Sequence, residues 1–381
     1  MKVSAHMPVW GQSGWEGLCR GILIGLDKLG VQVALDAKQR WNAEVIELDD
    51  EVQARLSRMS NNRADSAVSD VHFFHQQPTR EEFRSLGKNV DKIKKVCISL
   101  FETDRCPTPW IEGLNKMDEV WVFSEFNKEG WTKSGVKNVR VMPFGIDFDV
   151  YNSLARPINV KGRKKYMFVT NGDFTERKWF EGVIEAFVKE FSNEEDVCLL
   201  IKTHYAGFVR SYKDDVIKKI RECVNLFNKV NPPMILFFGD KVPEGQMPKF
   251  YAAGDCFVLA SRGEGLGLPY AEAMAMGLPV IATDTGGQRE FLNQENSYLI
   301  ESVPEVIDDM NYISKCLQAL NHKWATPNME TLRRTMRFVY QFQAEAKKKA
   351  DRGCEDISKY TWENTALWIV NRILEMKEGK K

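Results

Sequence analysis

Two glutamates eight positions apart, Glu264 and Glu272, stand in a segment rich in glycine. Gly263 and Gly265 flank the first of them, and glycine lets backbone N–H groups come close to a bound anion. Pro269 suits the first turn of a helix. Because a glycine loop that runs into a helix N-terminus attracts anions, the segment predicts an anion cradle with a carboxylate on each side.

A nucleotide sugar fits such a cradle. Its diphosphate needs N–H donors and positive charge, and its hydroxyl groups donate well to carboxylates. Arg177 and Lys178 are the expected cations, in a turn between a predicted strand at 166–170 and a helix. Ligands of doubly wound sheets bind at such carboxyl ends. Positive charge fixed there would stabilise a departing diphosphate, and preorganised electrostatics is usually the largest catalytic contribution.

The composition bounds the class of protein. A chain of 381 residues suits two domains. Lys and Arg number 53 and Asp and Glu also number 53, so a dedicated nucleic-acid binder is not expected. The eight cysteines contain no Cys-x-x-Cys pair, which disfavours zinc and disulfide frameworks. Without a signal-peptide pattern or a membrane-spanning run, we expect a cytoplasmic protein, and association with a membrane surface stays open.

Strand-like and helix-like segments alternate along the chain, which predicts an α/β fold with parallel sheets. The pattern restarts after a linker that begins at Pro143 and continues as a polar stretch to Lys165. The strand candidates are residues 31–35, 96–100, 119–123 and 139–142 in the first half, and 166–170, 197–202, 234–238, 256–259 and 279–283 in the second.

The glycine-rich segment resembles the donor site of GT-B retaining glycosyltransferases, and it looks most like glycosyltransferase family 4. The resemblance rests on EGLGLPYAE at 264–272, on the following GLPVIAT and on Gly286-Gly287. It implies two Rossmann-like domains facing a central cleft, residues 1–155 and 156–359. It also implies that the last helix, 360–381, packs back on the first domain. In that family the first glutamate meets the donor sugar and the second meets the ribose.

The segment that ends in Arg177-Lys178 resembles the family's Arg-Lys-Gly motif, with Trp179 in the place of the glycine. Asp173 stands where many members carry an arginine. The resemblance implies a catalytic role for Arg177, Lys178 and Glu264. It implies donor binding by Gly14, Gly172, Lys202, Lys241, Val242, Gly265, Leu266, Gly267 and Glu272. The base is expected against the loop 239–243, which family members use largely through its backbone.

The first domain is expected to hold the acceptor. Its loop Gly11-Gln-Ser-Gly14 resembles the family's glycine-rich first loop. Glu102 and Asp104 follow a predicted strand and could position an acceptor hydroxyl, as carboxylates do in general-base catalysis. His72 and His75, near the end of another predicted strand, are interpreted as structural.

The resulting hypothesis is a retaining, hexosyltransferase-type glycosyltransferase that needs no metal or other cofactor. Its donor is a nucleotide sugar, and its acceptor is a glycan, a lipid or a small molecule. A sugar-nucleotide epimerase, a phosphorylase and a non-catalytic sugar-nucleotide-binding protein stay open as alternatives. An NAD-dependent dehydrogenase is disfavoured, because Gly11-Gln-Ser-Gly-Trp-Glu does not supply the G-x-G-x-x-G turn that it needs.

Overall fold

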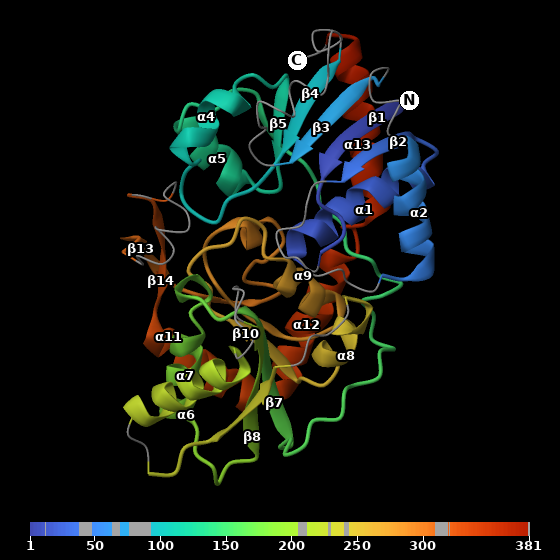
Figure 1. Ribbon diagram of the computed structural model, residues 1–381. Helices are drawn as coiled ribbons and strands as arrows, with labels where there is room; N and C mark the ends of the chain where they lie inside the picture. Colours follow the sequence, from blue (N-terminus) through green and yellow to red (C-terminus); the bar gives the residue numbers. More distant parts are fainter. Residues whose placement is uncertain are drawn as a thin grey trace. The chain divides into compact units, whose positions relative to one another are not determined.

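The chain forms two compact units, each built on its own parallel sheet (Figure 1). The first consists in the main of Met1–Asp147 and Lys359–Lys381, and the second of Phe148–Val242 and Gln246–Ser358. This computed structural model describes residues 1–11, 13–37, 48–62, 69–75, 93–204, 212–227, 230–239, 244–308, 319 and 321–379.

The first unit contains a six-stranded sheet in the order β2-β1-β3-β4-β5-β6, in which all neighbours run parallel. Its helices lie between the strands in sequence, except for the last one, α13. The strands are β1 (Lys2–Met7), β2 (Gln32–Ala37), β3 (Val71–His75), β4 (Lys94–Ile98), β5 (Glu119–Val122) and β6 (Val139–Val141). The helices are α1 (Gly14–Lys28), α2 (Asp50–Asn61), α4 (Thr108–Leu114), α5 (Glu125–Lys133) and α13 (Trp362–Lys377).

The last helix, α13, belongs to the first unit and packs against α1. Gly21 on α1 leaves room for the ring of Trp362, because a Cβ there would lie 2.1 Å from its Cε2. A buried ion pair ties the other end of α13 to the sheet: the Arg372 guanidinium donates to the Glu119 carboxylate of β5 at 3.1 Å. The chain therefore crosses back to the unit in which it began.

The second unit contains a six-stranded sheet in the order β12-β11-β10-β7-β8-β9, again with all neighbours parallel. Its first strand β7 lies beside its fourth strand β10, so the strand order reverses there. This is the Rossmann order, in which ligands bind outside the carboxyl ends at the point of reversal. The strands are β7 (Tyr166–Asp173), β8 (Val197–His204), β9 (Met234–Phe238), β10 (Cys256–Leu259), β11 (Val280–Thr283) and β12 (Tyr298–Ile300).

Helices and one antiparallel hairpin complete the second unit. The α-helices are α6 (Phe180–Glu190), α7 (Tyr212–Leu226), α8 (Met247–Tyr251), α9 (Leu268–Ala275), α11 (Met329–Gln341) and α12 (Gln343–Ile357). The 3₁₀-helices are η3 (Glu176–Lys178), η4 (Glu244–Gln246) and η5 (Gly287–Glu290). The hairpin pairs β13 (Ser302–Val306) with β14 (Lys323–Pro327). The predicted α/β class with two Rossmann-like domains is confirmed, whereas the hairpin was not predicted.

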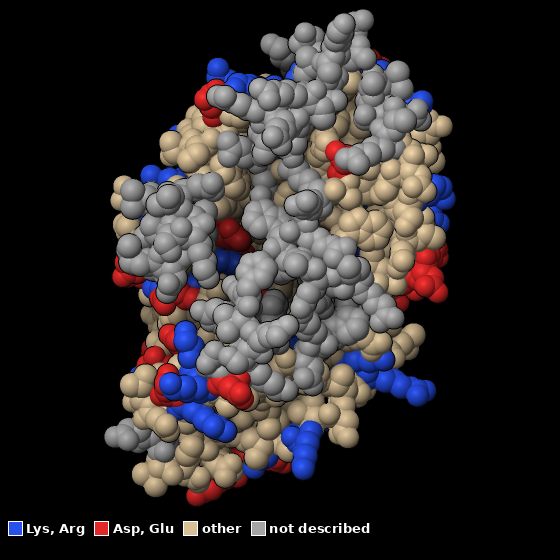
Figure 2. Space-filling view, in the orientation of Figure 1, with Lys and Arg blue, Asp and Glu red and all other residues tan. Residues whose placement is uncertain are grey.

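Charged side chains of both signs are interspersed on the described part of the face in Figure 2. No described helix is long and apolar enough to cross a membrane.

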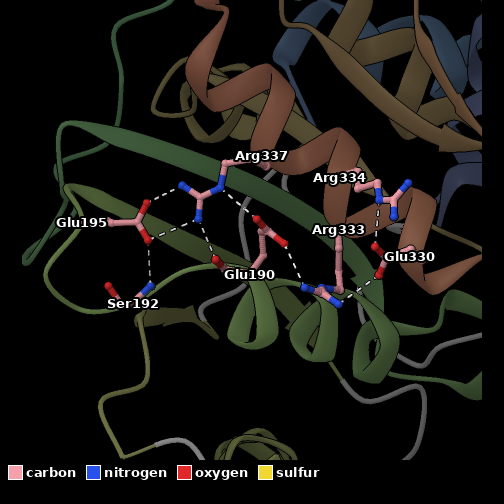
Figure 3. A network of polar contacts seen from close by, with 7 residues as sticks. All are labelled: Glu190, Ser192, Glu195, Glu330, Arg333, Arg334 and Arg337. Carbon is pink, nitrogen blue, oxygen red and sulfur yellow. Dashed lines mark hydrogen bonds and ion pairs between the residues drawn. The ribbon is translucent and has the colours of Figure 1, made fainter.

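An ion-pair network fastens α11 to the end of α6 (Figure 3). Arg337 donates to the Glu190 carboxylate at 2.9 Å and to the Glu190 backbone carbonyl at 2.6 Å. The same guanidinium contacts both carboxylate oxygens of Glu195 and lies over the ring of Phe191, 4.3 Å from its centroid. Because these partners lie more than 140 residues away in sequence, the network joins distant parts of the unit.

We predict that Arg337→Ala lowers the free energy of unfolding by about 1–3 kcal/mol, since it leaves two carboxylates without their shared donor. Arg334→Ala is the matched control. Arg334 lies on the same helix, 78% exposed, and pairs with Glu330 one turn away, so its loss should cost about 0.5 kcal/mol or less. Urea unfolding of both variants measures the difference. Equal losses would show that the network contributes no more than an exposed pair.

Candidate active site

The candidate site lies where the strand order of the second unit reverses. Strand β7 leads into η3, which carries Arg177 and Lys178, and β10 leads into the loop that carries Glu264. Two hydrogen bonds to one backbone carbonyl join these segments: Arg262 N–H donates to the Arg177 carbonyl at 2.7 Å, and the Ser261 hydroxyl donates to the same carbonyl at 3.2 Å. Two segments more than 80 positions apart in sequence are thereby held together at one edge of the sheet.

The centre of the site is a buried ion pair. Lys178 Nζ lies 2.6 Å from Glu264 Oε1, and the two residues are 7% and 6% exposed. Arg177 Nη1 lies 3.3 Å from the other carboxylate oxygen and also donates to the Gly263 carbonyl at 2.6 Å. The Glu264 carboxylate is therefore held between two cations.

Two effects of opposite sign set the charge of Glu264. Burial by itself raises the pKa of the carboxyl group, but Lys178 and Arg177 more than offset it and hold the pKa below the ordinary value of 4.5. Glu264 is therefore ionised at neutral pH. The site presents two cations that already lie at the carboxyl end of β7, each in a fixed position.

Glycine is required at two places where the backbone comes close to the site. At Gly287, a Cβ would lie 2.0 Å from the Gly265 carbonyl oxygen, and the Gly287 N–H donates to the Glu264 carbonyl at 2.8 Å. At Gly172, with φ of +146°, a Cβ would lie 3.3 Å from Lys178 Cε. The first glycine lets η5 pack on the Glu264 loop, and the second leaves room for the lysine chain.

Trp179 adopts the left-handed conformation, with φ of 51° and ψ of 43°, between η3 and α6. The resemblance led us to expect glycine at this position, and glycine reaches this region without strain. The ring of Trp179 packs over Gly182, where a Cβ would lie 2.2 Å from its Cε2. The backbone turn is thus kept although the residue differs, and the indole packing compensates for the strain.

Glu272, on α9, is held by two tyrosines. Tyr251 donates to its Oε2 at 2.6 Å, and Tyr151 donates to its Oε1 at 3.0 Å. Burial, with the nearby Glu272 charge, raises the pKa of Tyr251 well above 10, so this hydroxyl keeps its proton. Tyr251 also reaches Asn171 Oδ1 at 3.3 Å, which connects Glu272 to the end of β7.

Lys202 lies near the carboxyl end of β8, opposite Asn171 in the register of the sheet. Burial lowers its pKa, while the charges of Glu272 and Asp173 act in the opposite direction. Lys202 therefore shares its electrostatic surroundings with Glu272, and the structure brings these two predicted donor-binding residues together.

The sequence did not identify Arg262 as a site residue. It is 8% exposed and forms an ion pair with Glu176 of η3. It also donates to Glu305 of β13 at 2.7 Å and to Thr326 of β14 at 3.0 Å. Its guanidinium lies over Trp324, 4.9 Å from the ring centroid. Arg262 thus joins the Glu264 loop, η3 and the hairpin.

The remaining predicted residues fall into three groups. Gly265, Leu266 and Gly267 lie buried in the loop that leads into α9. Gly14, Glu102 and Asp104 belong to the first unit and are described there alone: Gly14 begins α1, and Asp104 pairs with Arg105 at 3.1 Å. Lys241 and Val242 lie outside the described residues. Lys178 itself is buried, in its ion pair with Glu264.

Comparison with known proteins bears on the second unit and on the whole fold. Residues 163–317 match the family model described as Glycosyl transferases group 1. The chain is 25% identical over 201 residues to O-antigen chain mannosyltransferase B of Escherichia coli, and the aligned region covers 52% of this chain and 43% of that protein. It is 47% identical over 58 residues to lipopolysaccharide core biosynthesis mannosyltransferase LpsB of Rhizobium meliloti, and this aligned region covers 15% of this chain and 16% of that protein. The chain thus matches less than half the length of each curated relative.

A solved structure with the same fold is HepE of Anabaena in complex with UDP and glucose. The TM-score is 0.66 at 14% identity, and the alignment covers 98% of this chain and 100% of that chain. The resemblance to GT-B glycosyltransferases of the family 4 type is therefore confirmed, and the match to Glycosyl transferases group 1 contains Arg177, Lys178 and both glutamates.

Proposed function

We propose that the chain is a retaining, hexosyltransferase-type glycosyltransferase that moves a sugar from a nucleotide-sugar donor to an acceptor hydroxyl. The observation that carries the proposal is the buried Lys178–Glu264 pair, with Arg177 beside it, at the reversal point of a Rossmann sheet. The relatives support it, since two are named as mannosyltransferases and one structural neighbour holds UDP and glucose.

The proposed chemistry places the donor diphosphate against Lys178 and Arg177. As the bond from the anomeric carbon to the diphosphate oxygen breaks, negative charge develops on that oxygen, and the two fixed cations stabilise it. The acceptor oxygen bonds to the anomeric carbon on the leaving-group face, and its proton passes to the departing diphosphate. Glu264 keeps the cations in place in the free protein and accepts hydrogen bonds from the sugar in the complex.

Glu272 is proposed to bind the ribose. Its two oxygens are oriented by Tyr151 and Tyr251, and each oxygen can accept more than one hydrogen bond. Lys202 would add positive charge close by. In this arrangement, binding of the nucleotide and stabilisation of the leaving group are assigned to different residues, and they can be tested separately.

We predict that Lys178→Ala lowers turnover by roughly 10²–10³, the scale for loss of one preorganised donor, and lowers donor affinity less. Steady-state kinetics with UDP-glucose and GDP-mannose as trial donors measure the effect. Lys189→Ala is the control, since this lysine is 45% exposed and pairs along α6 with Glu185.

Because Lys178 neutralises a buried carboxylate, the alanine variant needs a melting curve, and Lys178→Arg should keep the fold and restore part of the turnover. Near-parental turnover in a folded Lys178→Ala protein would remove the central step of the mechanism.

Glu272→Ala should weaken binding of the free nucleotide diphosphate about tenfold, while turnover at saturating donor changes far less, because the ribose differs little between ground and transition states. Tyr151→Phe removes one hydrogen bond to Glu272 Oε1 and should have a smaller effect of the same kind. Calorimetric titration with UDP and GDP tests both variants. An unchanged dissociation constant in Glu272→Ala would refute the ribose assignment.

We also propose that transfer needs no divalent metal, since Lys178 and Arg177 supply the positive charge that a metal ion would otherwise bring to the diphosphate. Turnover is therefore expected to be the same with EDTA as with added Mn²⁺ or Mg²⁺. Loss of turnover in EDTA that returns when Mn²⁺ is added would contradict the proposal.

A further inference from the structure

The first unit contains a cavity of about 320 Å³ that the proposed donor chemistry does not use. Trp10, in the loop after β1, forms one wall, and the last three residues of β2 form another. Ser57, Ser60 and Asn61 of α2 complete the lining. Small-molecule pockets range from about 300 to 1,000 Å³, so this cavity suits a single sugar ring. It lies at the carboxyl end of β2, the edge at which α/β sheets bind ligands.

The lining has the chemistry that recognises an uncharged saccharide. The half-buried Trp10 offers an aromatic ring that can pack on the apolar C–H face of a pyranose. The Asp36 carboxylate accepts hydrogen bonds from hydroxyl groups, and the Asn61 amide both donates and accepts. Among the described residues of the lining none is Lys or Arg, so these residues supply hydrogen-bonding groups and an aromatic ring rather than positive charge for an anion.

Asp36 is held in place from inside the unit. His6 Nδ1 lies 2.9 Å from Asp36 Oδ2, and the two residues face each other in the register of β1 and β2. Behind His6, the His72 ring lies 4.7 Å away and forms a 2.5 Å hydrogen bond with the Ser4 hydroxyl. Burial lowers the pKa of His72 to about 3, with His6 adding to the effect, so His72 is neutral at neutral pH.

This row of buried polar residues fixes a carboxylate whose side chain is still 29% exposed. A binding group that is oriented before the ligand arrives loses little entropy when it binds. Such support is unnecessary for a solvated surface aspartate, and it distinguishes Asp36 from the exposed acids of α2.

We propose that this cavity binds one uncharged pyranose unit, stacked on Trp10 and hydrogen-bonded to Asp36 and Asn61. In the proposed glycosyltransferase this unit belongs to the acceptor, and that part of the statement rests on the proposed function. The binding of a pyranose to the cavity is independent of the proposed function.

The test is equilibrium binding, by saturation-transfer NMR, of methyl α-D-glucopyranoside, methyl α-D-mannopyranoside and methyl β-D-galactopyranoside to the full chain without donor. At least one glycoside is expected to bind, with a dissociation constant that rises about tenfold or more in Trp10→Ala and in Asp36→Asn. Trp10→Phe, which keeps an aromatic face, should retain part of the affinity.

Two further variants separate loss of binding from loss of the fold. Asn61→Ala changes an exposed residue at the end of α2, so it should weaken binding without lowering the melting temperature. Asp50→Asn changes an exposed acid of the same helix outside the lining, and it should bind the glycoside as the parent does.

The inference is overturned if none of the glycosides binds the parent, or if Trp10→Ala and Asn61→Ala bind as tightly as the parent. Turnover of UDP-glucose and GDP-mannose distinguishes the two proposals. A parent that consumes a donor but binds no glycoside overturns the cavity assignment alone. A parent that binds a glycoside through Trp10 but neither binds nor consumes a donor supports the cavity and overturns the proposed function.

Discussion

A carboxylate buried between two cations is the constraint on which the second unit depends. Burying a lone charge is costly, and a buried ion pair is tolerated only where its geometry and hydrogen bonds are good. Glu264, Lys178 and Arg177 meet that condition because they approach from two strands whose carboxyl ends lie side by side. The position of η3 relative to the Glu264 loop is therefore coupled to a charge balance that an anionic ligand would alter.

Several contacts around the pair keep it in register. Arg262 holds η3 through Glu176 and through the backbone of Arg177, and it binds the hairpin with the same guanidinium. Glu272 is anchored separately, by tyrosines from the linker and from α8. The two glutamates are thus supported by different sets of residues, although they lie on one continuous segment.

The features that the sequence predicted are those that depend on residues close together in the chain. The glycine-rich segment, Arg177-Lys178 and most strands of the second unit are local patterns, and each lies where it was expected. The predicted strands 166–170 and 256–259 correspond to β7 and β10, the strands that carry the site. By contrast, Arg262 meets its partners 43 to 86 residues away, and Tyr151 meets Glu272 across 121 residues. Those contacts arise from tertiary packing, and no local sequence pattern predicts them.

Trp179 shows how a motif can change while its geometry stays. The turn after Lys178 needs a left-handed residue so that α6 can begin immediately, and glycine is the usual solution. Here a tryptophan takes that conformation, and Gly182 provides the space for its ring one turn later in α6. Glycine is thus used three positions after the turn, at the surface on which the indole packs, and not in the turn itself. Trp179 and Gly182 therefore depend on each other. A side chain at position 182 would displace the indole, and the turn that positions Lys178 would move with it.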